Sequence, residues 1–290
     1  MLIRIITALV LAPLALAGIY FLDLSAFALV VAAIIALASF EWAGLVFASV
    51  SSTSSADGAT IAPAPMVTSF VFVGATLAIC GFLWVRPELQ SKWLIVSSVC
   101  WAWAIVEVLI YPKQIATEPP AGRSVIRGNL RWVIFGLVVL PGAWAAMLLL
   151  KDPDPHLMVM VCFLVWGADA GAYFVGKAMG QRKLAPKVSP GKTWEGALGG
   201  AVVGVLASFA FGYFLIDSVS NNLLFTVLAL SVLVAVSVFG DLFESILKRT
   251  AGAKDSGRLL PGHGGILDRI DALIAVLPPM ALVALLGPGG

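Results

Sequence analysis

Long apolar runs separated by short polar stretches dominate the hydropathy pattern of this chain. Each run holds about 20 residues, enough for an α-helix to cross roughly 30 Å of hydrocarbon. The polar, Pro-containing stretch at 48–66 is expected to be a flexible connector. The pattern predicts an all-α, polytopic integral membrane protein with nine spans, at about 4–22, 25–47, 67–85, 93–111, 132–150, 157–176, 196–216, 223–243 and 266–286.

Composition supports the membrane class. Of the 290 residues, 60% are hydrophobic and 12% are charged, which is about half the usual charged share. The three cysteines lie inside apolar runs without disulfide or metal spacing, so they are expected to fill the core. The first run resembles a signal peptide with Ala-Leu-Ala at 15–17, but it continues to Leu22. We therefore expect an uncleaved first span.

Lysine and arginine are distributed unequally between the two sides of the predicted bundle. Most lie at the N-terminus and in the even-numbered loops, whereas the opposite side holds Arg86, Lys92 and Lys151. The positive-inside rule places the N-terminus and the even loops in the cytoplasm and the C-terminus outside. The sequence divides into 1–150, with about five spans, and 151–290, a catalytic transmembrane region with cytoplasmic loops 177–195 and 244–265.

With this orientation, the acidic residues of the spans share one depth. A carboxylate in hydrocarbon costs several kcal/mol unless it is paired, hydrated or metal-bound. We therefore expect a polar cavity open to the cytoplasm. For Glu41 and Glu107 the alternative, a helix-end acid that reaches the headgroup layer, stays open. The acids of the cytoplasmic half are Glu41, Glu107, Asp169, Asp241, Glu244, Asp268 and Asp271.

Glycines recur at helical spacing in two adjacent spans. Gly167, Gly171 and Gly176 lie in one span, and Gly196 and Gly200 lie four apart in the next, followed by a further glycine at 204. Small-residue faces of this kind let two helices approach closely. They are not nucleotide fingerprints, because no strand precedes them.

The segment 182–195, "RKLAPKVSPGKTWE", gathers basic and hydroxyl side chains. It is not a phosphate loop, because the required upstream glycine and strand are absent. Pro190 and Gly191 are expected to form a turn before a helix whose N-terminal amides, with Lys192 nearby, attract phosphate. The alternative is a positive-inside loop that touches anionic lipid headgroups.

The segment 241–271 concentrates the charges of the C-terminal region. Asp241, Glu244, Ser245 and Lys248 share one helical face, and carboxylates also open the last span. Carboxylates from two helices form a hard oxygen site that suits Mg²⁺ beside substrate phosphates. A salt-bridged surface loop is the alternative. A lone His263 is weak evidence for a general base, and a turn or phosphate contact is favoured. The cations that would balance polyphosphate charge are Lys248, Arg249, Lys254, Arg258 and Arg269.

The pattern Ser-x-x-Lys-Arg, then Lys-Asp, Pro-Gly-His-Gly-Gly and Asp-Arg-x-Asp runs from Ser245 to Asp271. It resembles the bacterial phosphatidate cytidylyltransferases, also called CDP-diacylglycerol synthases. The N-terminal part of the chain is matched only by hydropathy. A second block resembles that family through Asp169, Tyr173, Gly176, Leu184, Pro186, Ser189, Pro190, Lys192, Thr193, Glu195 and Gly196.

This resemblance implies a multi-pass enzyme of the bacterial inner membrane, with its active site facing the cytoplasm. It would join CTP to phosphatidic acid, giving CDP-diacylglycerol and pyrophosphate. It further implies Mg²⁺, sometimes K⁺, a homodimer among membrane lipids, and no nucleic acid. Asp241 and Asp268 would be the metal ligands. Catalytic candidates are Asp241, Asp268, Lys248, Arg249 and Asp271; substrate-binding candidates are Ser189, Lys192, Thr193, Ser245, Lys254, Asp255, His263, Arg269 and Asp169.

The chemistry requires no strong base, since a phosphate monoester is already anionic at pH 7. A divalent cation with lysines and arginines would remove the repulsion between the two substrates. A CTP-dependent lipid kinase and an isoprenoid-lipid cytidylyltransferase are alternatives within lipid chemistry. An ion-coupled transporter is an alternative from another class, but the sequence lacks the broken helix pairs and internal repeats typical of one.

Overall fold

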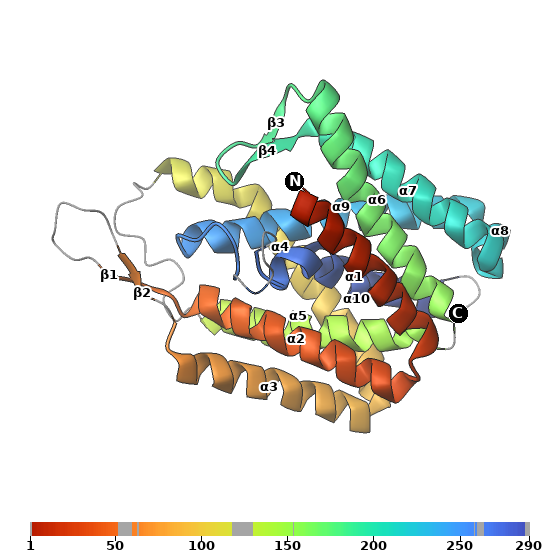
Figure 1. Ribbon diagram of the computed structural model, residues 1–290, viewed down its shortest axis with the longest axis horizontal. Helices are drawn as coiled ribbons and strands as arrows, with labels where there is room; N and C mark the ends of the chain where they lie inside the picture. Colours follow the sequence, from red (N-terminus) through yellow and green to blue (C-terminus); the bar gives the residue numbers. More distant parts are fainter. Residues whose placement is uncertain are drawn as a thin grey trace.

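The structure, a computed structural model, describes residues 2–51, 60–62, 64–117, 130–152, 154–257, 259 and 264–287. At 2–8, 49–51, 60–62 and 112–117 only the backbone is described. Figure 1 shows long helices packed side by side, with α3 along one edge. The long helices are α1 (Leu2–Phe21), α2 (Leu24–Val46), α3 (Met66–Val85), α4 (Gln90–Thr117), α5 (Leu130–Lys151), α6 (Pro155–Met179), α7 (Trp194–Leu215), α9 (Leu223–Thr250) and α10 (Leu267–Leu286). Shorter elements are η1 (Pro87–Leu89), α8 (Asp217–Asn221), and strands β1 (Ser49–Ser51), β2 (Thr60–Ala62), β3 (Lys183–Ala185) and β4 (Ser189–Thr193).

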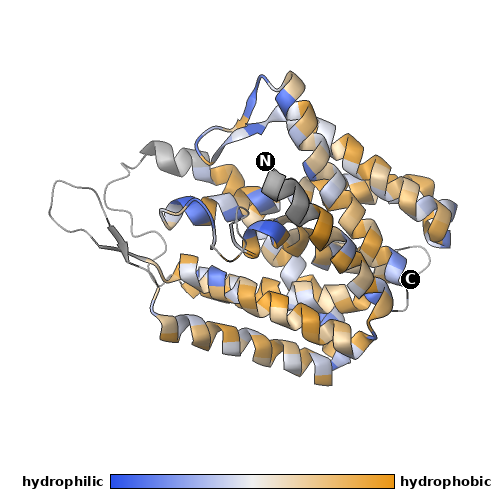
Figure 2. Cartoon of the chain, in the orientation of Figure 1, coloured by the Kyte–Doolittle hydropathy of each residue, from blue (hydrophilic) through white to orange (hydrophobic). Residues whose placement is uncertain are grey.

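The helices confirm the all-α, polytopic membrane class. Within the described residues, eight are long and apolar enough to cross a bilayer, and the described apolar part of α1, Leu9–Phe21, is shorter. Hydrophobic residues predominate along the long helices (Figure 2), and many of them are exposed on the outside of the bundle. Phe70, Leu198 and Leu228 are more than half exposed there. Such faces suit acyl chains, because lipid tails solvate apolar side chains without cost.

Several predicted boundaries are wrong. The loop expected at 244–265 begins only after Thr250, because α9 continues for seven residues beyond the predicted end at 243. Ile246 and Leu247 are buried, so packing against other helices keeps the polar residues 244–250 helical. The other predicted loop, 177–195, contains an antiparallel β3–β4 hairpin that the sequence did not indicate. The connector at 48–66 contains a second short pair, β1 with β2.

Helices α6 and α7 form a close pair, which confirms the small-residue prediction. Gly196, Gly200 and Gly204 are all buried along one face of α7. A Cβ atom at position 200 would lie 2.5 Å from the carbonyl oxygen of Ala168, and one at position 204 would lie 2.6 Å from that of Leu164. Only glycine permits this approach.

Helix α5 is the most buried span and packs against α2, α3, α4 and α10. Aromatic rings from α2, α4 and α5 gather around Phe243 of α9, which is fully buried. Trp42 Nε1 in this cluster donates a hydrogen bond to the carbonyl of Trp132 at 3.2 Å. The cluster fixes the turn of α9 that carries Glu244. The cysteines are unpaired, with Cys80 and Cys162 buried, as expected of core fillers.

Candidate active site

The β3–β4 hairpin closes the end of the α6–α7 pair. The Glu195 carboxylate accepts hydrogen bonds from the amides of Gln181 and Arg182 at 3.1–3.2 Å, which fixes the start of the hairpin. Thr193 caps α7, because its hydroxyl oxygen accepts the amide of Gly196 at 3.1 Å. Arg249 Nε of α9 donates to the carbonyl of Val188 at 3.3 Å and ties the hairpin to that helix.

A cavity of about 390 Å³ lies between α6, α7, β4 and α9. Glycines and alanines of α6 and α7 form part of its wall and leave space that larger side chains would fill. Lys192 of β4 forms an ion pair with Asp241 of α9, where both side chains remain about 30% exposed, at 27% and 31%. Ser245 Oγ donates to Asp241 Oδ1 at 3.4 Å. The polar residues that line the cavity are Asp169, Tyr173, Lys177, Lys192, Thr193, Ser237 and Asp241.

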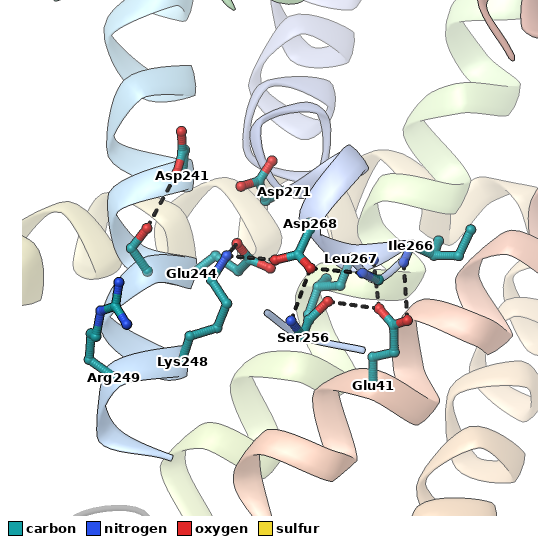
Figure 3. A network of polar contacts seen from close by, with 12 residues as sticks. Glu41, Asp241, Glu244, Lys248, Arg249, Ser256, Ile266, Leu267, Asp268 and Asp271 are labelled. Carbon is teal, nitrogen blue, oxygen red and sulfur yellow. Dashed lines mark hydrogen bonds and ion pairs between the residues drawn. The ribbon is translucent and has the colours of Figure 1, made fainter. Parts of the chain in front are cut away.

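A second polar cluster lies one turn farther along α9 (Figure 3). Lys248 Nζ donates to Glu244 Oε2 at 2.5 Å and to Asp268 Oδ1 at 2.6 Å. The other oxygen of Asp268 accepts the amides of Ser256 at 2.9 Å and Gly265 at 2.8 Å. The side chains of Lys248 and Asp268 are 13% and 6% exposed. This pair is therefore enclosed, in contrast to Lys192 and Asp241.

Asp271 lies between the two clusters (Figure 3). Its Oδ1 accepts the amide of Ala272 at 2.7 Å. Carboxylates of Asp241, Glu244 and Asp169 are all close enough to interact with it electrostatically. Arg269 interacts with Asp169 in the same way. Thus α6, α9 and α10 direct acidic groups to one region, and Lys192 and Lys248 balance part of that charge.

The carboxylate oxygens of this region are donors of the type that Mg²⁺ takes, and a full set of protein ligands is not found among the described residues. No group of three or more His, Cys, Asp or Glu side chains is arranged around a common ion position within the described ranges. Mg²⁺ uses one or two carboxylates together with substrate phosphates and water. Asp241 of α9 and Asp268 of α10 carry such oxygens. Asp241 contacts Lys192 and Ser245, and Asp268 contacts Lys248 and two backbone amides, so a bound ion would have to replace the lysine contacts. In addition, Glu244 Oε1 is buried without a hydrogen-bond partner in the described part of the chain.

Not every predicted site residue reaches the cavity. Ser189 is half-buried at the start of β4 and is not among the described lining residues. Lys254 and Asp255 are exposed in the turn that follows α9. Arg249 contacts the hairpin instead of the cavity. His263 lies outside the described residues.

Two residues that contact the site were not predicted as site residues from the sequence, namely Glu41 and Ser256. Glu41 of α2 accepts the amides of Ile266 at 3.0 Å and Leu267 at 2.8 Å, and the hydroxyl of Ser256 at 2.9 Å. These partners are more than 200 positions away in the chain, so no local spacing indicates them. The other undecided acid, Glu107, lies 3.7 Å from Arg131 in a partly exposed ion pair.

Comparison with known sequences agrees with this architecture. The sequence model of the Cytidylyltransferase family matches residues 2–286. The chain therefore belongs to the cytidylyltransferase family, whose members are nucleotidyltransferases. Within it, the phosphatidate cytidylyltransferase of Pseudomonas aeruginosa is 42% identical over 281 residues, which cover 96% of this chain and 94% of that protein. That of Haemophilus influenzae is 39% identical over 236 residues, covering 71% and 77%.

A third relative matches a shorter part of the chain. The phosphatidate cytidylyltransferase of Bacillus subtilis is 45% identical over 117 residues, which cover 40% of this chain and 43% of that protein. These relatives carry the cytidylyltransferase name, so they do not favour the kinase or transporter alternatives.

Proposed function

We propose that this protein transfers a cytidylyl group from CTP to phosphatidic acid, giving CDP-diacylglycerol and pyrophosphate. The observation that carries the proposal is one cavity that brings together Asp169, Lys192 and Asp241. It occurs in a chain that matches phosphatidate cytidylyltransferases along nearly its whole length. Lysines and carboxylates in one cavity suit a reaction between two phosphate groups. The lysines can bind the phosphates, and the carboxylates can bind a cation that neutralises them.

The reaction follows from the charges of the substrates. A phosphate oxygen of phosphatidic acid attacks the α-phosphorus of CTP, and the bond to the pyrophosphate group breaks. The nucleophile is already anionic near neutral pH, so positioning and charge neutralisation supply most of the rate enhancement. Lys192 and Lys177 border the cavity, and either can meet a substrate phosphate there. Lys248 pairs with Asp268 and Glu244 in the neighbouring cluster, whose residues are not among the described lining residues of the cavity.

Mg²⁺ is part of the proposal, with Asp241 and Asp268 as the residues that would hold it. When bound, the ion would neutralise phosphate charge and stabilise the leaving pyrophosphate. The observation that supports it is the oxygen-only donor set, in which Glu244 pairs with Lys248 through Oε2 while its Oε1 makes no hydrogen bond within the described residues. A role for K⁺ at the same acidic region is an expectation from the family resemblance.

The membrane setting defines how the lipid enters. We place the site on the cytoplasmic side of the bacterial inner membrane, supported by the concentration of lysine and arginine in the loops of that side. Tyr173 lines the cavity and is 48% exposed, which leaves one wall accessible from the side of the bundle.

A homodimer in the membrane and the absence of a nucleic-acid partner are the remaining parts of the proposal.

Purified protein with labelled CTP provides the test. Label at the α-phosphorus should appear in lipid only when phosphatidic acid and Mg²⁺ are present, with one pyrophosphate released for each lipid formed. Transfer of γ-phosphorus label to lipid would instead establish the kinase. Preferential labelling of an isoprenoid phosphate in an acceptor panel would establish the other cytidylyltransferase. An absence of labelled lipid with every acceptor would contradict all three.

A further inference from the structure

Glu41 is a buried acid without an assigned role. It lies near the end of α2, is 8% exposed, and has no lysine or arginine within ion-pair distance among the described residues. A buried charge of this kind is costly unless hydrogen bonds compensate it. The Glu41 carboxylate accepts three: two amides from the N-terminus of α10 and one hydroxyl from Ser256 (Figure 3).

The contacts of Glu41 replace a missing helix cap. Ile266, at the N-cap position of α10, makes no side-chain cap hydrogen bond. Glu41 Oε1 and Oε2 satisfy the first free amides of that helix from a different span. A carboxylate at this end also interacts favourably with the helix dipole. Glu41 therefore fixes where α10 begins.

The start of α10 is also where Asp268 is oriented. Ser256 donates its hydroxyl to Glu41 and its amide to Asp268 Oδ2. Gly265, adjacent to an amide that Glu41 binds, donates to the same Asp268 oxygen. With Oδ2 held by these two amides, Oδ1 is left to contact Lys248. A shift of the Glu41 carboxylate would thus move both groups that orient Asp268.

Two glycines allow this close approach. A Cβ atom at Gly257 would overlap Glu41 Oε1, and one at Gly265 would overlap both Glu41 Oε2 and Ser256 Oγ. The chain therefore leaves no room for a side chain on either side of the carboxylate. Since Glu41 itself is not among the lining residues of the cavity, it acts through these neighbours.

We propose that Glu41 is a positioning residue for the active site, which holds Ser256 and the start of α10 and thereby orients Asp268. The inference rests on the proposed function, because its kinetic consequence is read in CDP-diacylglycerol synthesis. Displacements of about 1 Å remote from the reacting atoms are known to cost about 10²-fold in rate.

The test compares Glu41→Ala and Glu41→Gln with wild-type protein. Glutamine keeps one acceptor oxygen but turns an amide group toward the remaining donor, so its effect should lie between those of wild type and alanine. We expect kcat to fall about 10²-fold in Glu41→Ala, with KM for CTP changed less than about threefold, because Glu41 touches no substrate. Amide hydrogen exchange of residues 264–270 should accelerate in parallel.

Matched variants separate positioning from general loss of stability. Glu107→Gln removes the charge of an acid of α4 that pairs with Arg131 and makes none of the Glu41 contacts, so it should change neither kcat nor exchange at 264–270. Gly265→Ala should reproduce the Glu41→Ala phenotype by displacing the carboxylate. Wild-type kcat in folded Glu41→Ala protein, or a lowered kcat with unchanged exchange at 264–270, would overturn the proposal. If wild-type protein made no CDP-diacylglycerol, the proposed function would fail, while exchange would still test the Glu41 contacts.

Discussion

The two lysine–aspartate pairs of the site differ in how completely the protein surrounds them. Lys192 and Asp241 meet at the wall of the cavity, and each remains about 30% exposed, at 27% and 31%. Lys248 and Asp268 are 13% and 6% exposed and share further partners in Glu244, Ser256 and Gly265. The open pair can exchange partners for a substrate phosphate, whereas the enclosed pair is held in place by additional hydrogen bonds.

This difference has an energetic basis. An exposed ion pair contributes little to stability, about 0–1 kcal/mol, since solvent screens it and its side chains lose entropy. Removing one partner of an enclosed pair leaves the other charge buried and uncompensated, which costs about 3–5 kcal/mol. The open pair should therefore affect mainly catalysis, and the enclosed pair should affect both catalysis and folding.

Asp268→Asn should have the largest effect on activity. The amide group would face either Lys248 or the donor amides of Ser256 and Gly265, and the carboxylate charge would be lost. We expect synthesis of CDP-diacylglycerol to fall by about 10³-fold, as when a charge-stabilising group is removed from an active site. Turnover of purified protein measures this. Asp217→Asn on α8, at the other end of α7, is the matched control and should retain full activity.

Lys248→Ala should lower both activity and stability. Its removal leaves Glu244 and Asp268 enclosed without their cation, which should cost about 3–5 kcal/mol. Unfolding of the protein in detergent micelles measures the stability, and Lys248→Arg, which keeps the charge, should recover most of it. A Lys248→Ala protein as stable as wild type would show that water already compensates these acids.

Lys192→Ala should lower kcat/KM by about 10- to 10²-fold through loss of a phosphate contact, while stability changes by less than about 1 kcal/mol. Lys183→Ala on the neighbouring strand β3 removes the same charge outside the cavity and serves as its control. Equal losses in the two variants would indicate a general effect of loop charge on anionic substrates. That result would contradict a specific role for the open pair.

Ser245→Ala should have the smallest effect. Its hydroxyl makes one long hydrogen bond of 3.4 Å to Asp241. Loss of a hydrogen bond of this kind is expected to cost about 0.5–1.5 kcal/mol, or about 2- to 10-fold in kcat/KM. A complete loss of activity would instead indicate that Ser245 contacts a substrate directly.

The sequence predicted the membrane class and most spans because hydropathy over about 20 residues is a strong local signal. It also predicted Lys192, Asp241, Lys248 and Asp268 as residues of one site from two motifs of short spacing. In the structure Lys192 and Asp241 line the cavity, whereas Lys248 and Asp268 pair in a neighbouring cluster. The end of α9 was missed, because polar residues at 244–250 indicate a loop unless their packing against other helices is known.

Other features depend on contacts between distant parts of the chain. Glu41 meets Ser256 and the start of α10 only after α2 and α10 have packed together. When a residue of one helix caps another helix, neither sequence shows a periodic pattern that indicates the contact. Similarly, Arg249 meets the carbonyl of Val188 only in the folded hairpin. From the sequence alone, this cation was therefore predicted to balance phosphate charge.

The turnover of purified Asp241→Asn protein with CTP, phosphatidic acid and saturating Mg²⁺ tests the central claim most directly. Asparagine preserves the shape of the side chain and keeps an oxygen for Ser245, but it removes the charge opposite Lys192. The account predicts that CDP-diacylglycerol formation falls by at least about 10²-fold while the protein remains folded in the membrane. Turnover within a few-fold of wild type would contradict the claim that this carboxylate helps two anionic substrates to react.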